Sequence, residues 1–184
     1  MNETLKAIQT RYSCRDFNST PLTDDHVNAL ADAALASPSA MNRQPWHVIM
    51  ITNKGIIDEM DTEAMNILAN AEDKTMYERI QSRGGKIFYN APAMVLVLSD
   101  DSRWGALDAG ILTQNVALAA HSLGLGNVIC AMANIPLSGP KAEEYKKSLG
   151  FPEGYSFGMA ILVGTANSGK DPHEHDQSKV TYVK

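Results

Sequence analysis

The stretch Ala93-Met-Val-Leu-Val-Leu-Ser99 decides the fold, because it is an uncharged apolar run of the length of a strand. A run without alternating polar residues is typical of a strand that is buried on both faces in the middle of a sheet. Farther along the chain, apolar residues between Arg103 and Leu123 fall on nearly all sides of a helix. The sequence therefore predicts a central strand beside a central buried helix.

Other elements are predicted on both sides of this pair. Short runs rich in Val and Ile predict strands over residues 47–52, 127–132 and 156–164. Helices are expected over residues 1–11, 23–37, 56–70, 74–84 and 138–149. Thr23 is expected to be an N-cap, and Gly124, Gly126 and Gly150 are expected to lie past helix ends. This order fits either an α+β or an α/β fold, and periodicity alone does not decide between them. No linker or repeat divides the chain, so one domain over residues 1–184 is expected.

Composition excludes several classes of protein. The 184 residues are 44% hydrophobic and 20% charged, as in an ordinary globular chain. A net charge of -5 argues against nucleic-acid binding, and no apolar run approaches the roughly 18 residues of a membrane span. The amino end lacks the apolar core of a signal peptide, and Cys14 and Cys130 are too few for a disulfide framework. We expect a cytoplasmic protein with no membrane or nucleic-acid partner.

Two arginines flank a short polar segment where the first helix is expected to end. Arg11 and Arg15 enclose Tyr12, Ser13 and Cys14. Two guanidinium groups, a hydroxyl and free backbone N–H groups suit a phosphate monoester, because planar guanidinium groups bind phosphate oxygens in pairs. The same arginines also fit a surface pair that complements a helix C-terminus. The spacing alone leaves both interpretations open.

A second polar segment, Ser37-Pro-Ser-Ala-Met-Asn-Arg-Gln-Pro-Trp46, lies between two prolines. Amide side chains such as those of Asn42 and Gln44 both donate and accept hydrogen bonds, which suits the edge of a flat heterocycle. Turn residues of this kind are equally typical of an ordinary connection from helix to strand.

Two further basic residues lie farther along the chain, where Arg83 and Lys86 can add positive charge near a bound anion.

Patterns for other chemistry are weak. Gly124-Leu-Gly126 follows a helix and lacks the third glycine of a dinucleotide fingerprint, so a Rossmann site is rejected. His173-Glu-His175 has no third ligand, and no metal is expected. Cys14 has no histidine partner at a defining spacing, and Ser13 and Ser39 lack a nucleophile elbow. Hydrolase chemistry is therefore unsupported.

In this order, the polar segments resemble those of the nitroreductase family. The matching pieces are Arg11–Phe17, Ser37–Trp46, Asn90-Ala-Pro92, Ala119–Gly126 and Leu149–Tyr155. The similarity runs from about Leu5 to Val163. It implies an α+β fold with a central, mostly antiparallel sheet wrapped by helices. It also implies a homodimer with exchanged C-terminal arms and with two FMN sites at the subunit interface.

The resemblance also implies roles for particular residues. The residues that match the family's contacts to the FMN phosphate and ribityl chain are Arg11, Tyr12, Ser13 and Arg15. Those that match the segment reaching the flavin from the other subunit are Pro38, Ser39, Ala40, Asn42 and Gln44. The residues that match the place of a backbone N–H beside flavin N5 are Cys130, Ala131 and Met132. The family often ends with basic residues on the phosphate, and this tail offers Lys170, His173 and His175. The strip at 130–132 lacks the family's more frequent glycine or acidic residue, so the acceptor pocket is expected to differ.

The function implied is that of an FMN-dependent oxidoreductase. A hydride would pass from NADH or NADPH to a nitroaromatic, quinone or related electron-poor acceptor by a ping-pong mechanism. Flavin carries this chemistry, so no catalytic acid or base is expected among the side chains. The alternatives are an FMN-binding protein for storage or sensing without turnover, and a scaffold protein without flavin. The sequence does not predict the physiological acceptor or the preferred nicotinamide.

Overall fold

The computed structural model describes residues 1–184 and places one four-stranded sheet at the centre. Its strands are β1 (Trp46–Ile51), β2 (Ala93–Asp100), β3 (Gly126–Ile129) and β4 (Tyr155–Gly164). The spatial order is β1-β2-β4-β3, and every neighbouring pair is antiparallel. Helices packed on a wholly antiparallel sheet make an α+β fold, which confirms the fold class implied by the resemblance.

Strand β2 is the buried central strand that its apolar run predicts. It pairs with β1 on one side and with β4 on the other. Every residue of β2 except Asp100 is buried, because helices cover both faces of the sheet.

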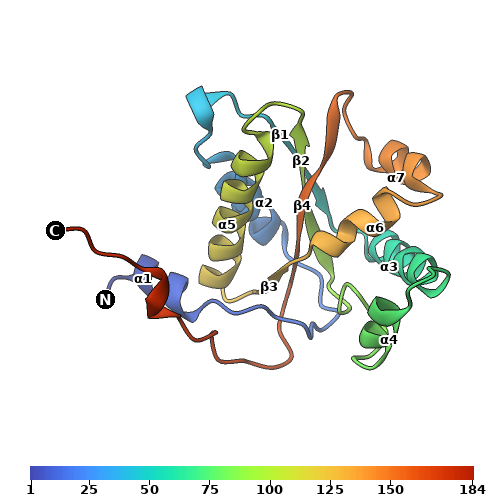
Figure 1. The fold of residues 1–184 in the computed structure, drawn as a ribbon, viewed down its shortest axis with the longest axis horizontal. Coiled ribbons are helices and arrows are strands. Elements are labelled where there is room, and N and C mark those ends of the chain that lie inside the picture. The colour runs from blue at the N-terminus through green and yellow to red at the C-terminus, as the bar shows by residue number, and fades with distance from the viewer.

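Two layers of helices enclose the sheet (Figure 1). The helices are α1 (Glu3–Thr10), α2 (Asp24–Leu35), α3 (Lys54–Ala69), α4 (Thr75–Gln81), α5 (Gly105–Ser122), α6 (Asn134–Leu137) and α7 (Ala142–Leu149). Short 3₁₀ turns are η1 (Ala40–Asn42), η2 (Ala131–Ala133) and η3 (Gln177–Lys179). Helices α2 and α5 cover one face, and α3, α4, α6 and α7 cover the other (Figure 1). None of these helices combines the length and apolar character needed to cross a membrane.

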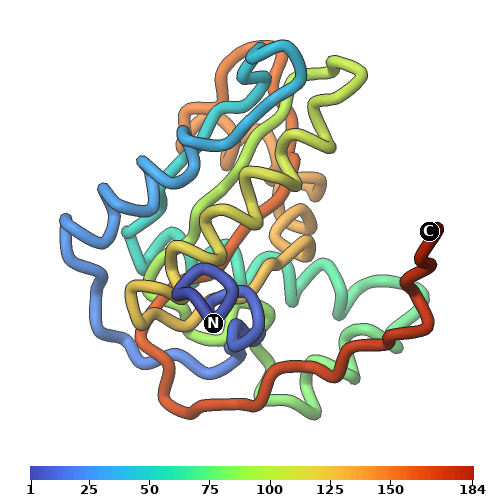
Figure 2. Tube along the Cα trace, turned by 90° about the vertical axis from the view of Figure 1, so that its left-hand side faces the viewer, coloured from blue at the N-terminus to red at the C-terminus, as the bar shows by residue number.

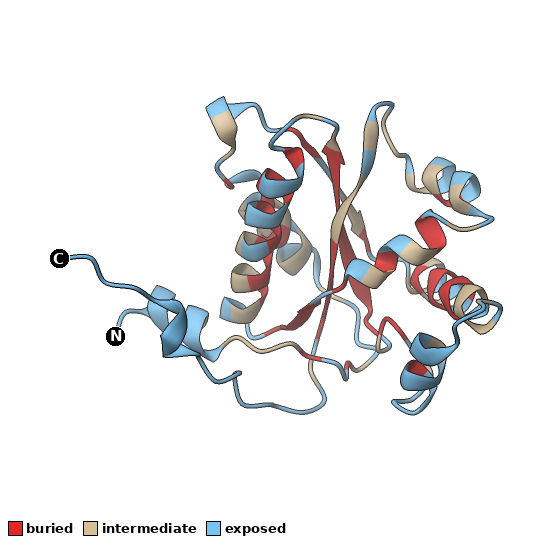
Figure 3. Ribbon diagram, viewed as in Figure 1, coloured by how far each residue is buried: buried red, intermediate tan, exposed pale blue.

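Each face of the sheet has its own hydrophobic core, and the buried residues concentrate along the strands (Figure 3). On the α2 and α5 side, Leu30 and Leu112 belong to the same buried cluster as Val97. On the opposite side, Met60 of α3 belongs to the same buried cluster as Leu96.

Several predicted elements differ from those in the structure. The strand predicted over Asn127–Met132 ends at Ile129, and the N–H of Ala133 bonds to the carbonyl of Cys130 at 3.2 Å to close the tight turn η2. The helix predicted to begin at Ser138 begins at Ala142, after the unpredicted short helix α6. Gly126 belongs to β3 instead of ending a helix, whereas Gly124 does lie past the end of α5 with φ +75°.

Helix α5 is the element whose burial the sequence overstates. Leu107 is 59% exposed and Ile111 is 36% exposed, although the apolar pattern predicts burial on nearly all sides. The opposite side, including Leu112 and Val116, packs on the sheet as expected. An apolar helix surface that faces solvent in a single chain is typical of a surface that another molecule covers.

The segment after α1 is held against the edge of the sheet. Its Cys14 N–H donates to the carbonyl of Asn127 in β3 at 2.9 Å. A Cβ atom added to Gly126 would lie 2.9 Å from the Cys14 sulfur, so glycine permits this close approach. The chain leaving β4 runs beside the same segment, since Asn167 N–H donates to the carbonyl of Asp16 at 3.0 Å. These bonds bring the amino and carboxyl ends of the chain together.

Candidate functional site

The first cavity lies where these two ends of the chain meet. It has a volume of about 350 Å³. Its lining comes from Arg11, Tyr12, Ser13 and Arg15 after α1 and from Lys170, Asp171, Pro172 and His173 of the tail. The Tyr12 hydroxyl donates to the carbonyl of Ser168 at 3.2 Å and so ties the two walls together. The structure thus brings the predicted phosphate-binding segment together with Lys170 and His173, whereas His175 does not line the cavity.

Beyond the cavity, the tail continues as an extended arm (Figure 2). Its last apolar residues are uncovered, with Val180 53%, Tyr182 79% and Val183 94% exposed. The arm therefore forms no core contact within its own chain.

The guanidinium group of Arg11 has an unpartnered nitrogen beside the first cavity. Its Nη1 atom is buried and has no hydrogen-bond partner. None of the four ion pairs of the structure includes Arg11 or Arg15. Burial, and then the charge of Arg11, lower the pKa of His121, so this neighbour is neutral near pH 7 and does not repel the guanidinium group. A buried guanidinium nitrogen without a partner fits an anion that has several acceptor oxygens.

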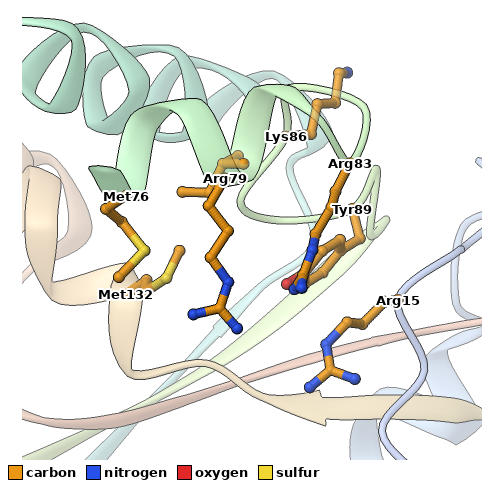
Figure 4. Close-up of a pocket in the computed structure, with 8 residues that line it drawn as sticks. Arg15, Met76, Arg79, Arg83, Lys86, Tyr89 and Met132 are labelled. Carbon is orange, nitrogen blue, oxygen red and sulfur yellow. The ribbon is translucent and has the colours of Figure 1, made fainter. Parts of the chain in front are cut away.

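A second cavity, of about 210 Å³, adjoins the first and shares Arg15 with it. Its other lining residues are Met76, Arg79, Ile80, Arg83, Lys86, Tyr89 and Met132. The guanidinium groups of Arg15, Arg79 and Arg83 point toward a common space, and Met76 lies beside Met132 (Figure 4). The amine of Lys86 points away from that space and donates to Asn90 Oδ1.

The predicted strip at residues 130–132 borders the second cavity only through Met132. Cys130 is buried, and its backbone N–H donates to the carbonyl of Ala160 at 2.8 Å. Ala131 is exposed.

The predicted loop from Pro38 to Gln44 lies elsewhere in the chain. The backbone N–H of Ala40 donates to the buried carboxylate of Asp108, in the first turn of α5, at 3.3 and 3.4 Å. The first cavity lies at the other end of α5, where His121 hydrogen-bonds to Thr10 at 2.8 Å. About 20 Å of helix separate Asp108 from His121, so a single chain does not bring this loop to the cavities (Figure 1).

Unusual backbone conformations mark both the loop and the second cavity. Five residues other than glycine have positive φ: Met41, Asn42, Gln44, Tyr89 and Asn90, with φ between 49° and 60°. Such conformations cost roughly 1–3 kcal/mol each and concentrate at ligand-binding sites. The loop also holds itself in shape, since Gln44 N–H donates to Ser39 Oγ at 2.9 Å and Gln44 Nε2 donates to Asn42 Oδ1 at 3.1 Å.

One buried carboxylate fixes the segment that carries Lys86 and Tyr89. Asp61 of α3 is 5% exposed, and its Oδ1 accepts hydrogen bonds from the backbone N–H groups of Ile87 at 2.8 Å and Phe88 at 3.0 Å. Burial raises the pKa of the Asp61 carboxyl group.

The sequence did not predict Asp61 as a site residue, nor did it predict Met76, Arg79 or Tyr89. The spacing of four residues between Arg79 and Arg83 was the available signal, since such residues share one helix face.

Both cysteine thiols are expected to be unreactive in the folded protein. Burial raises the pKa of Cys14, and it raises the pKa of Cys130 to about 11. Near neutral pH the thiolate fraction of Cys130 is therefore about 100-fold smaller than that of an ordinary cysteine, and the thiolate is the reactive form. Mass spectrometry after iodoacetamide treatment should show neither residue labelled in the time that glutathione reacts fully, and both labelled in urea. Rapid labelling of the native protein would contradict this buried placement.

Comparison with known proteins identifies the family. A sequence model of the nitroreductase family matches residues 8–165. The chain belongs to the nitroreductase family. The match spans the segment after α1, the loop at η1 and the four strands of this nitroreductase-family protein.

Solved structures of similar fold match this nitroreductase-family chain over its whole length. A nitroreductase with bound FMN from Desulfitobacterium hafniense is 49% identical, with a TM-score of 0.96 and 100% of both chains covered. A nitroreductase with bound FMN from Bacteroides fragilis is 26% identical, with a TM-score of 0.90 and 100% of both chains covered. A protein of Archaeoglobus fulgidus with NAD(P)H nitroreductase in its name is 28% identical over 186 residues, covering 96% of this chain and 92% of that protein.

Proposed function

We propose that this protein is an FMN-dependent oxidoreductase that transfers a hydride from NADH or NADPH to a nitroaromatic, quinone or related electron-poor acceptor by a ping-pong mechanism. The observation that carries the proposal is the first cavity, in which a buried nitrogen of Arg11 lacks a partner. A phosphate ester supplies the acceptor oxygens that this nitrogen needs. The FMN named for the Desulfitobacterium relative supports the choice of ester.

The first cavity would hold the phosphate and the second would hold the ring. Arg11, Ser13 and the tail residues Lys170 and His173 line the first cavity and would surround the phosphate. Arg15 lines both cavities, so its guanidinium group lies where the ribityl chain would pass from one cavity to the other. The backbone N–H of Cys130 is already bonded to Ala160, so any N–H that faces flavin N5 from the 130–132 strip belongs to Ala131 or Met132.

FMN, when bound, supplies the hydride transfer between nicotinamide and acceptor, and the protein supplies position and electrostatics. The guanidinium group of Arg15 at the boundary of the two cavities favours negative charge on a ring held there. Met132 and Ile80 give the second cavity an apolar wall that can contact a flat ring. No side-chain acid or base is required, and we propose that none is catalytic.

We further propose a homodimer of single-domain chains, each spanning residues 1–184. The exposed apolar residues Leu107 and Ile111 of α5 would pack at the interface. Pairing across a twofold axis would carry the loop from Pro38 to Gln44 of each chain to the cavities of the other. The uncovered apolar end of the tail, from Val180 to Val183, would form an exchanged arm on the partner.

Anaerobic titration of the FMN-loaded protein tests the function. NADH or NADPH should bleach the flavin absorbance rapidly, and a nitro compound should restore it. Initial rates at several acceptor concentrations should give parallel double-reciprocal lines. An FMN-binding protein for storage or sensing would keep its colour under the same titration. Absence of any shift in melting temperature on addition of FMN would instead favour a scaffold without flavin.

A further inference from the structure

Several basic side chains line the second cavity. Its lining contains Arg15, Arg79, Arg83 and Lys86 and no acidic residue, although the chain as a whole has a net charge of -5. None of these four cations belongs to an ion pair of the structure. The amine of Lys86 points away from the cavity, so the local cluster of positive charge consists of the three arginines, none of which has an ion-pair partner.

The arginines of this cluster divide into two groups by position. Arg15 also lines the first cavity, where Arg11 lies, and these two guanidinium groups are sufficient to grip one phosphate. Arg79 and Arg83 line the second cavity only, and they enter it from α4 and the turn after it. Their guanidinium groups point into the same space as that of Arg15 (Figure 4).

Backbone hydrogen bonds fix the turn after α4, from which Arg83 projects. The Arg83 N–H donates to the carbonyl of Ile80 at 3.0 Å, and the Gly85 N–H donates to the same carbonyl at 3.0 Å. Gly84 and Gly85 have φ of 104° and 70°, which allow the chain to reverse here. Between the arginines and Met132 the cavity wall is apolar, with Met76 and Ile80.

We propose that Arg79 and Arg83 select a co-substrate that carries a carboxylate or a phosphate, with its flat body against Met76. This inference rests on the proposed FMN site, because a ring seated against Met132 leaves these two guanidinium groups for a second anion. Two sources have this chemistry: the carboxylate of an aromatic acceptor and the 2′-phosphate of NADPH. Guanidinium groups pair with either in bidentate geometry.

Binding to the FMN-loaded protein, measured by calorimetry without turnover, tests the proposal. One arm compares 4-nitrobenzoate with the uncharged 4-nitrobenzamide, and the other compares NADP⁺ with NAD⁺. In at least one arm the more anionic probe should bind about 10- to 100-fold more tightly, as charge-assisted hydrogen bonds imply. The arm that shows the preference identifies the source of the anion. High salt should reduce the preference.

Three variants are measured in both binding comparisons. Arg79→Gln and Arg83→Gln should each lower the affinity ratio by about tenfold or more, whereas Lys147→Gln, which removes an exposed charge on α7, should leave it unchanged. Equal affinities in both arms for the unmodified protein would overturn the proposal. So would an unchanged ratio in both arginine variants, or loss of FMN from them, since the arginines would then belong to the cofactor site. A protein that discriminates between the probes but is not reduced by nicotinamide would refute the proposed catalysis and leave this inference standing.

Discussion

Arg11→Ala should lower the affinity for FMN by about 100-fold while leaving the apoprotein at least as stable as the unmodified protein. A hydrogen bond to a charged group contributes about 1.5–3 kcal/mol, and 1.4 kcal/mol corresponds to tenfold in affinity. Without ligand, Arg11 Nη1 is buried and unpartnered, so the substitution removes an unsatisfied buried donor and breaks no ion pair. Fluorescence titration with FMN and thermal unfolding of the apoprotein measure the two effects.

The matched control for this variant is Lys147→Ala. It makes the same change in net charge on α7, away from both cavities, and FMN affinity should stay within about twofold. Arg15→Ala should also lose FMN while remaining folded. Normal flavin content in both arginine variants would show that the phosphate lies elsewhere.

Asp61→Ala should destabilise the protein by about 2–4 kcal/mol. The substitution leaves the buried N–H groups of Ile87 and Phe88 without an acceptor, and each such group costs about 1–3 kcal/mol. The segment carrying Lys86 and Tyr89 would lose its anchor, so affinity for FMN should also fall. Urea unfolding of the apoprotein measures the first effect. A loss below about 0.5 kcal/mol would mean that these two hydrogen bonds do not hold the segment.

Asp61→Asn gives the pH test of the same residue, because asparagine keeps an acceptor oxygen but carries no charge. Burial raises the pKa of the Asp61 carboxyl group above its unfolded value. The stability that Asp61 contributes is therefore fully present below the unfolded pKa and is lost as pH rises through the raised folded pKa. Measured across that window, the stability of the asparagine variant relative to the unmodified protein should increase with pH. A decrease would mean that the charged carboxylate is the favoured form in the folded state.

The sheet was the most predictable part of the fold. The apolar run at Ala93–Ser99 has a composition that fits a buried strand, and the structure places it between two neighbours as β2. Cys130–Met132 shows the limit of the same reasoning, since three residues of similar composition turn out of the sheet as η2. Runs this short have no periodicity that separates a strand end from a tight turn.

Helix α5 shows a different limit. Its apolar pattern predicts burial, but Leu107 is exposed in the single chain. A hydrophobic core and a subunit interface select the same residue types, so composition does not distinguish them.

The sequence named most residues of the first cavity but only part of the second, namely Arg15, Arg83, Lys86 and Met132. Arg11 and Arg15 are close in sequence, so their grouping was visible, and the structure places His173, which the sequence also offered, in the same cavity. Arg79 and Met132 are brought together only by the packing of α4 near η2. The backbone strain at Met41 and Tyr89 was also invisible, because neither residue type favours positive φ.

We propose that FMN lies between the arginine cavity of one chain and the η1 loop of another. A crystal structure of the FMN-saturated protein tests it most directly. We predict a dimer in which Arg11 and Arg15 of one protomer hold the phosphate and the loop 38–44 of the partner touches the ring. Phosphate bound away from Arg11, or an interface packed shut with no space for a flavin, would contradict the account.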